Sequence, residues 1–163
     1  MKYVIGIDIG GTNLRIGTVD EEGNLTNFER KSSESLVSEG AVENLGNEVK
    51  SYIERYKLEG RVGAISVGVP SMVSKDKSFI YSTPNLKGLE NIDLGHLLGD
   101  YVNIPVFVDR DVNYLLVNDI KTHGLDPDRE RTILGFYLGT GFGNAVYING
   151  QLHVGKNGVA GEL

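Results

Sequence analysis

Three apolar runs separated by very short turns open the chain. The runs extend from Tyr3 to Ile9, from Leu14 to Val19 and from Leu25 to Arg30, and the turns between them contain glycine and asparagine. Apolar, β-branched runs joined in this way are typical of consecutive antiparallel strands. The chain is therefore predicted to begin with a three-stranded meander.

Helical and strand patterns alternate after this meander. Apolar residues at helical spacing predict an amphipathic helix from Ser35 to Lys57, and the small, apolar run from Val62 to Val69 predicts a strand buried on both faces. Further elements are predicted at Phe79–Tyr81 (strand), Ile92–Tyr101 (helix), Pro105–Val108 (strand) and Asp111–His123 (helix). This order indicates an α/β fold with a mixed five-stranded sheet and helices on its faces.

A charged segment that contains a proline, Asp126 to Arg131, is interpreted as a linker. Beyond it, Thr132–Leu138 and Asn144–Asn149 predict a glycine-rich β hairpin. We therefore divide the chain into a first lobe, residues 1–124, and a linker with the start of a second lobe, residues 125–163. A hairpin that only begins a sheet has free edges and an uncovered apolar face, so self-association through it or mobility of this second part is expected.

Composition and charge exclude several classes of function. The chain has no cysteine, which excludes a disulfide scaffold, a cysteine nucleophile and a thiolate metal site within it. It has neither a signal peptide nor an apolar run long enough to cross a bilayer, so a cytoplasmic protein without a membrane partner is expected. The net charge of −6 also argues against a nucleic-acid partner, which would require a basic face.

Polar and glycine residues collect where the predicted strands end. Asp8 and Gly10–Thr12 follow the first strand, and Pro70–Ser71 follow the strand that ends at residue 69. Asp109–Asp111 and Gly139–Gly143 follow two later strands. Because ligands of mixed α/β sheets bind outside the carboxyl ends of the strands, these segments predict one site at that edge.

Both glycine runs are suited to binding phosphate. Adjacent glycines expose successive backbone N–H groups, and Thr12 adds a hydroxyl donor, while Asp8 is a candidate ligand of Mg²⁺, directly or through water. The run Gly139–Gly143 is neither a Walker A loop nor a dinucleotide fingerprint. Either run can also be a plain hairpin turn, with Asp8 as a capping residue.

Asp111 is the candidate catalytic base. Phosphoryl transfer to a hydroxyl needs a carboxylate that orients the hydroxyl and accepts its proton. Asp111 opens a predicted helix, so a purely capping role is the alternative. The chain has no G-x-S-x-G run, and its three histidines lack metal-ligand spacing, which argues against a serine hydrolase and a histidine metal site.

Three motifs resemble those of a known family. The run I-G-I-D-I-G-G-T-N-L-R from Ile5 to Arg15 resembles the first phosphate motif of the ROK family of sugar kinases and repressors. The run Y-L-G-T-G-F-G from Tyr137 to Gly143 is similar to the second phosphate motif of that family, and G-V-A-G-E-L from Gly158 to Leu163 is similar to the start of its sugar-binding motif. The resemblance covers nearly the whole chain.

The resemblance implies an actin-like (ribonuclease H-like), two-lobed ATPase fold that binds ATP and Mg²⁺ between the lobes and transfers phosphate to a hexose. Asp111 would then take the proton from the 6-hydroxyl of the sugar. The residues implied on one side of the phosphates and Mg²⁺ are Asp8, Gly10, Gly11 and Thr12. Those implied on the other side are Gly139, Thr140 and Gly141, and those implied for the sugar are Asn85, Arg110 and Glu162.

Three further runs resemble most closely the branch of the family that phosphorylates D-allose. They are Ser74–Lys77, Ser82–Leu86 and Arg110–Asn113. Most ROK glucokinases carry Glu-Asn-Asp where this chain has Asp109-Arg110-Asp111. Arginine offers only donors in place of the asparagine that usually contacts the sugar, so an epimer of glucose such as allose is the predicted substrate.

The chain ends at Leu163, where the family continues into a zinc motif and the adenine-binding part of the second lobe. The chain itself therefore has no predicted zinc ligands. We expect the N-terminal part of a homodimeric hexose kinase that has little or no activity alone. The alternatives are a non-catalytic fragment that binds sugar or phosphate, and a kinase for glucose, fructose or mannose. A ROK repressor is disfavoured, because no helix-turn-helix precedes the first phosphate motif.

Overall fold

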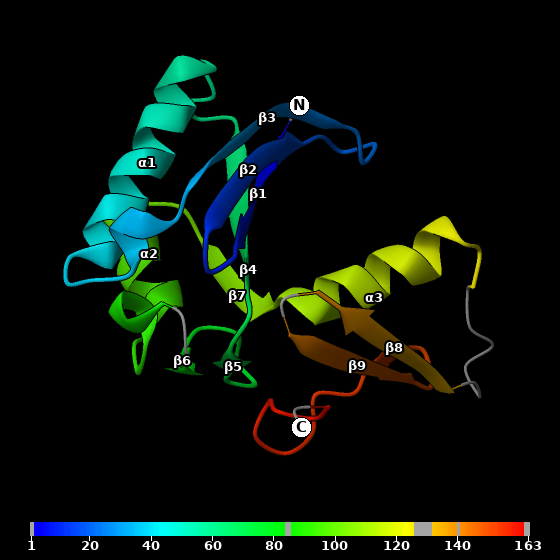
Figure 1. The fold of residues 1–163 in the computed structure, drawn as a ribbon. Helices are drawn as coiled ribbons and strands as arrows, with labels where there is room; N and C mark the ends of the chain where they lie inside the picture. The colour runs from blue at the N-terminus through cyan, green and yellow to red at the C-terminus, as the bar shows by residue number, and fades with distance from the viewer. Residues whose placement is uncertain (1, 84–85, 126–131, 140, 162–163) are drawn as a thin grey trace.

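The fold is built on one large sheet and two small ones in a computed structural model that describes residues 2–83, 86–125, 132–139 and 141–161. The large sheet has the order β3-β2-β1-β4-β7 (Figure 1). Its strands are β1 (Tyr3–Ile9), β2 (Asn13–Val19), β3 (Leu25–Ser32), β4 (Val62–Val69) and β7 (Val106–Arg110). The first three are antiparallel, whereas β4 and β7 run parallel to β1, which confirms the mixed five-stranded sheet.

The two small sheets are built from β5 (Met72–Val73) with β6 (Ile80–Ser82), and from β8 (Thr132–Leu138), β9 (Phe142–Ile148) and β10 (Gln151–Leu152). The helical elements are the 3₁₀ turns η1 (Glu34–Leu36) and η2 (Lys87–Leu89) and the helices α1 (Ala41–Arg55), α2 (Leu94–Val102) and α3 (Asp111–Thr122). None of the helices in these described ranges is long and apolar enough to cross a membrane.

Helices α1 and α2 cover only one face of the large sheet (Figure 1). The alternation in β1 explains this choice, because Ile5, Ile7 and Ile9 are buried on the helix side. Gly6 and Asp8 alternate with them and so point to the other face. The main core is thus one-sided, and the opposite face is left to present polar groups.

The helix expected from Ser35 begins instead at Ala41 and ends at Arg55, so that boundary prediction was wrong. The 3₁₀ turn η1 precedes it and buries Leu36. Gly40 then adopts a left-handed conformation (φ 82°), which interrupts any helix that starts earlier. Only the apolar residues from Ala41 onward form the buried face of helix α1.

The helix expected from Ile92 begins two residues later, at Leu94. Ile92 pairs with Ile80 in an isolated β bridge, and the Asp93 side chain accepts a hydrogen bond from the His96 N–H at 3.2 Å. An aspartate cap of this kind fixes where a helix starts.

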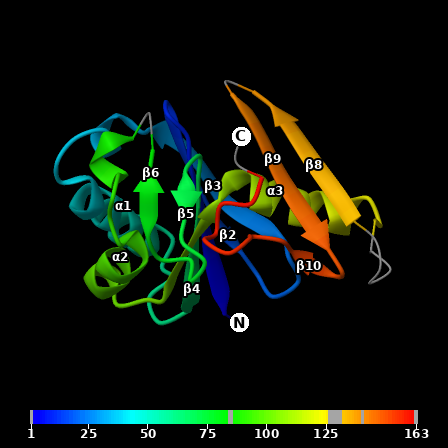
Figure 2. The same cartoon turned by 90° about the horizontal axis from the view of Figure 1, so that it is seen from below.

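Helix α3 leaves the large sheet and packs against the second sheet (Figures 1 and 2). Val112, Leu116 and Ile120 form a separate buried cluster with Ala145 of β9. The outer face of this sheet carries exposed apolar side chains, namely Leu134, Phe136, Leu138 and Phe142. The expected uncovered apolar face is confirmed, while self-association through it stays a prediction.

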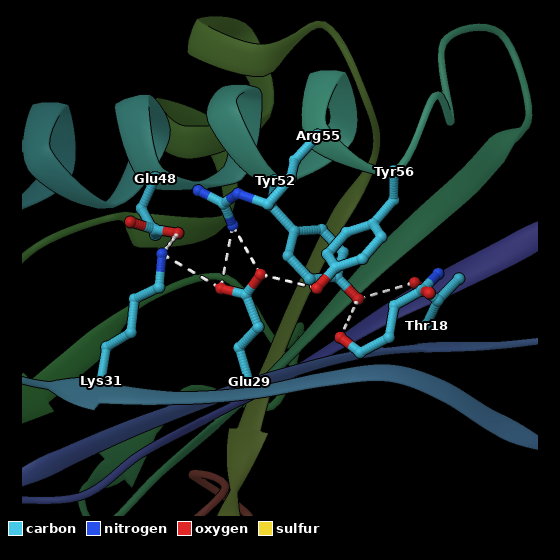
Figure 3. A network of polar contacts seen from close by, with 8 residues as sticks. Thr18, Glu29, Lys31, Glu48, Tyr52, Arg55 and Tyr56 are labelled. Carbon is cyan, nitrogen blue, oxygen red and sulfur yellow. Dashed lines mark hydrogen bonds and ion pairs between the residues drawn. The ribbon is translucent and has the colours of Figure 1, made fainter.

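A network of charged and phenolic groups joins β3 to α1 (Figure 3). Glu29 lies at its centre, with Arg55 Nη1 at 2.6 and 2.9 Å from its two carboxylate oxygens and the Tyr56 hydroxyl donating at 2.8 Å. Lys31 Nζ lies 3.1 Å from Glu29 and also pairs with Glu48 of α1. The Glu29 side chain is only 17% exposed, so the network replaces water around it.

Replacing Glu29 by glutamine is expected to flatten the acid dependence of stability. Burial alone would raise the pKa of Glu29, but hydrogen bonds from Tyr56, Lys31 and Arg55 outweigh it and lower the pKa below 4.5. The stability that Glu29 contributes is therefore present above about pH 4.5 and is lost as the pH falls through the lowered pKa. We expect Glu29→Gln to cost about 1–2 kcal/mol at pH 7 and to lose less stability than the parent between pH 7 and pH 3.

Urea unfolding across this pH range measures both effects. Glu39→Gln is the matched control, because Glu39 is exposed. Equal losses of stability on acidification in the parent and in Glu29→Gln would contradict the prediction.

Candidate active site

Two carboxylates lie in one rung of the large sheet. Asp8 of β1 is in register with Gly68 of β4, and Gly68 is in register with Asp109 of β7. Residues in register share a face, so both carboxylates point away from α1 and α2. With strands about 4.8 Å apart, the two Cα atoms are separated by about 10 Å. The predicted convergence of Asp8 and Asp109 at the carboxyl edge is therefore found.

Asp111 lies next to Gly68, the residue between Asp8 and Asp109 in this rung. The first turn of α3 passes so close to β4 that a Cβ on Gly68 would lie 3.6 Å from the Asp111 Cα and 3.4 Å from Tyr114 Cδ2. The Asp111 carboxylate accepts a hydrogen bond from the Val112 N–H at 2.7 Å. Burial raises the pKa of the Tyr114 phenol, so this side chain is uncharged at neutral pH and lines the site next to Asp111.

Asp8 is paired with a neighbouring cation. Arg15 Nη1 lies 2.5 Å from Asp8 Oδ2, and both side chains are nearly half exposed. The two residues are cross-strand partners in β1 and β2. One accessible carboxylate suits Mg²⁺, which is usually held by one or two carboxylates together with substrate phosphates and water. The described residues include no cluster of three or more histidine, aspartate or glutamate side chains arranged for a metal.

The β1–β2 turn closes with a hydrogen bond from the Gly10 N–H to the Asn13 carbonyl at 2.8 Å. The Gly10 amide is thus occupied within the turn, whereas Gly11 and Thr12 are exposed beside Asp8. The turn is also fastened to β3, because Arg30 Nε donates to Asn13 Oδ1 at 2.9 Å.

The end of β8 and the start of β9 lie near the β1–β2 turn in both views (Figures 1 and 2). The Gly139 N–H donates to the Gly141 carbonyl at 2.9 Å, and a Cβ on either glycine would meet nothing within 4 Å. The described parts of the two glycine runs therefore lie near each other, and the surroundings of Gly139 and Gly141 are open.

Asp109 is a buried carboxylate with several partners. Its Oδ1 accepts from the Arg110 N–H at 2.8 Å and from Asn113 Nδ2 at 2.7 Å. Its Oδ2 forms an ion pair with Lys77, whose Nζ lies 2.8 Å away. The roles of Lys77 and Asn113 were missed by sequence reasoning. The i, i+4 spacing of Asp109 and Asn113 across a helix start was the available signal for the second.

Arg110 is 4% exposed, and its Nη1 donates to the Ala160 carbonyl at 2.7 Å. It therefore reaches the segment that precedes the predicted sugar ligand Glu162. Asn85, Thr140 and Glu162 lie outside the described residues, so their expected contacts stay predictions.

The sequence of this chain matches that of a known protein family. The sequence model of the ROK family matches residues 4–163. The chain belongs to the ROK family. Its α/β architecture is the N-terminal part of the actin-like ATPase fold of ROK sugar kinases, as predicted.

Several ROK relatives are sugar kinases. The chain is 30% identical to a glucokinase of Streptomyces coelicolor over 163 residues, covering 100% of this chain and 49% of that protein. It is 29% identical to an N-acetyl-D-glucosamine kinase of Haemophilus influenzae, covering 97% of this chain and 50% of that protein. The chain thus spans about half the length of the curated relatives it matches.

A solved ROK structure agrees with this assignment. A ROK family glucokinase from Streptomyces griseus in complex with glucose and AMPPNP superposes with a TM-score of 0.81 at 28% identity, covering 98% of this chain and 49% of that chain. A ROK family transcriptional regulator superposes with a TM-score of 0.86 at 20% identity, which shows the fold alone. The ROK membership expected from the motifs is confirmed. The kinases named among the relatives are glucokinases and an N-acetyl-D-glucosamine kinase, so the D-allose branch stays a prediction.

Proposed function

We propose that this chain is the N-terminal part of an ATP-dependent hexose kinase that transfers the γ-phosphate of ATP to the 6-hydroxyl of its sugar. The observation that carries the proposal is the meeting of Asp8 and Asp111 at one sheet edge, beside two neighbouring glycine turns. Kinship with ROK sugar kinases supports the same reaction class.

In the proposed reaction, the sugar hydroxyl oxygen attacks the γ-phosphorus, the bond to the β-phosphate oxygen breaks, and the hydroxyl proton passes to Asp111. Asp111 is suited to this task because the first turn of α3 holds it above the sheet edge. ADP leaves with the former bridging oxygen. Asn85 and Glu162 are proposed to hydrogen-bond other sugar hydroxyls.

Both glycine turns are proposed to hold the phosphate chain. Gly11 and Thr12 would face it from the first turn, with Gly10 shaping that turn, and the run Gly139–Gly141 would face it from the second. Mg²⁺ bound near Asp8 would offset the negative charge of the phosphates. Arg15 must share or leave the Asp8 carboxylate for this, because it lies on Oδ2.

D-allose is the proposed sugar, on the resemblance of three sequence runs to the D-allose kinases and on the arginine at position 110. Homodimer formation and a cytoplasmic location are kept as predictions. The relatives span about twice this length, so the proposed activity belongs to the protein that includes the other lobe.

A coupled assay of ADP release tests the proposal on the full product of the gene that encodes this chain, with allose, glucose, mannose, fructose and N-acetylglucosamine. We expect turnover that depends on ATP and Mg²⁺, with the highest kcat/KM for allose, and near-zero turnover for the 163-residue chain alone. Higher kcat/KM for glucose would overturn the choice of sugar. No turnover with any hexose, together with saturable heat of sugar binding without ATP, would instead favour a non-catalytic binding protein.

A further inference from the structure

The segment 153–161, which we name the return loop, follows β10 and comes back between the two halves of the structure (Figure 2). It is tied to the second sheet at its start, where the His153 N–H donates to the Val146 carbonyl at 2.8 Å. It closes on itself through a hydrogen bond from the Ala160 N–H to the Val154 carbonyl at 3.0 Å. The return loop is therefore an ordered turn with defined contacts.

Two left-handed glycines seat the return loop against its neighbours. Gly158 (φ +84°) lies so close to β5 that a Cβ would be 2.3 Å from the Val73 carbonyl oxygen. Gly161 (φ +83°) lies so close to β9 that a Cβ would be 2.5 Å from Asn144 Oδ1. The loop thus contacts the first half of the chain on one side and the second half on the other.

Arg110 supplies a charged contact between these two seats. Its backbone N–H is held by the Asp109 carboxylate, and its guanidinium donates to the Ala160 carbonyl at 2.7 Å. A hydrogen bond from a charged donor is stronger than one from a neutral donor. The backbone of Arg110 is therefore held at the end of β7, and its guanidinium group is held by the return loop.

We propose that Arg110 is a positioning residue that holds the return loop in place and so fixes the path of the chain as far as position 161. Resting on the proposed function, this means that the residue directly before the base Asp111 also positions the segment that carries the predicted sugar ligand Glu162. The base and the sugar-binding segment are then aligned by one side chain. This role adds to the substrate contact predicted for Arg110.

Substitutions of Arg110 by lysine and by glutamine distinguish this positioning role from simple packing. Lysine retains a positive donor but lacks the planar, forked guanidinium, so it preserves at most part of the contact. Glutamine is shorter and neutral and loses the contact with the Ala160 carbonyl. We expect opening of the return loop to increase about 10- to 100-fold in Arg110→Gln, and by less in Arg110→Lys.

Hydrogen exchange of this chain measures that opening without any ligand or activity. The His153 and Ala160 amides report on the return loop, because both are hydrogen-bonded, and peptides from α1 report on global unfolding. Arg61→Gln is the matched control, since Arg61 is an exposed arginine that contacts Tyr3 far from the loop. Faster exchange confined to the return loop in both Arg110 variants, but absent in the control, supports the proposal.

Unchanged exchange of the return loop in Arg110→Gln overturns the proposal, whatever the kinase assay gives. If Arg110→Gln fails to fold, Arg110→Lys decides in the same way. Gly161→Ala opens the loop from its other seat, so its effect should be less than additive with that of Arg110→Lys. Full additivity of the two changes would also count against a shared contact.

Discussion

Replacing Asp111 by asparagine is expected to lower kcat for hexose phosphorylation by the full gene product about 10²- to 10⁴-fold. Asparagine has nearly the same size and keeps an oxygen that can accept the Val112 N–H, so the start of α3 should be preserved. It cannot accept the proton of the sugar hydroxyl at neutral pH. KM for the sugar should therefore change much less than kcat, because binding groups are retained while the base is lost. Steady-state kinetics with saturating ATP and Mg²⁺ measures both parameters.

Asp100→Asn is the control for this experiment. Asp100 is an exposed aspartate in α2, on the far side of the sheet from the rung of Asp8 and Asp109. It should leave kcat within about twofold of the parent. A similar kcat for Asp111→Asn and the control would remove Asp111 from the role of base, even if the protein proves to be a hexose kinase.

The position of the site could be predicted from sequence because it depends on local patterns. The strands β1, β4 and β7 read as apolar runs, and Asp8, Asp109 and Asp111 lie where the first and last of these runs end. Parallel strands bring their carboxyl ends to one edge, so the meeting of these residues needs no knowledge of side-chain contacts. The glycine runs were found for the same reason.

The contacts that hold the site together could not be predicted in this way. Lys77 reaches Asp109 from a turn 32 positions earlier, and it does so with a left-handed backbone (φ 62°) that is unusual for lysine. The hydrogen bond from Arg110 to Ala160 likewise joins residues 50 positions apart. No local pattern encodes such pairs, because they arise only when separate elements pack.

The start of helix α1 was also predicted wrongly from the sequence, and the reason again lies in packing. Val37 continues the helical spacing of apolar residues, yet it is 41% exposed and lies outside α1. Apolar spacing cannot distinguish a helical turn from the 3₁₀ turn η1, since both bury one residue every three or four positions. The sequence signal that could have placed the start of α1 was Gly40, because glycine readily adopts the left-handed conformation found there.

Replacing Gly88 by alanine is expected to destabilise the chain by about 3 kcal/mol. Gly88 lies in η2, where a Cβ would be 2.2 Å from the Ser38 carbonyl oxygen and 2.8 Å from both the Leu36 carbonyl oxygen and the Ala41 Cβ. Two of these neighbours are backbone atoms, so relief requires η1 or the start of α1 to move rather than a side chain to rotate. That movement would also strain the hydrogen bond from the Gly88 N–H to the Val37 carbonyl, at 3.1 Å. Urea unfolding at pH 7 measures the loss.

Gly63→Ala is the matched control, because a Cβ on Gly63 of β4 would make only ordinary contacts, the nearest at 3.8 Å. Its stability should stay within about 0.5 kcal/mol of the parent. Domains of this size are stable by about 5–15 kcal/mol, so a loss of about 3 kcal/mol at Gly88 moves the unfolding midpoint visibly. If both variants unfold at the parent's urea concentration, η2 does not pack against η1 and α1 as closely as described. A large loss of stability confined to Gly88→Ala is the expected result. It would show that the close packing of neighbouring atoms requires a glycine here, because the φ angle of Gly88 is not left-handed.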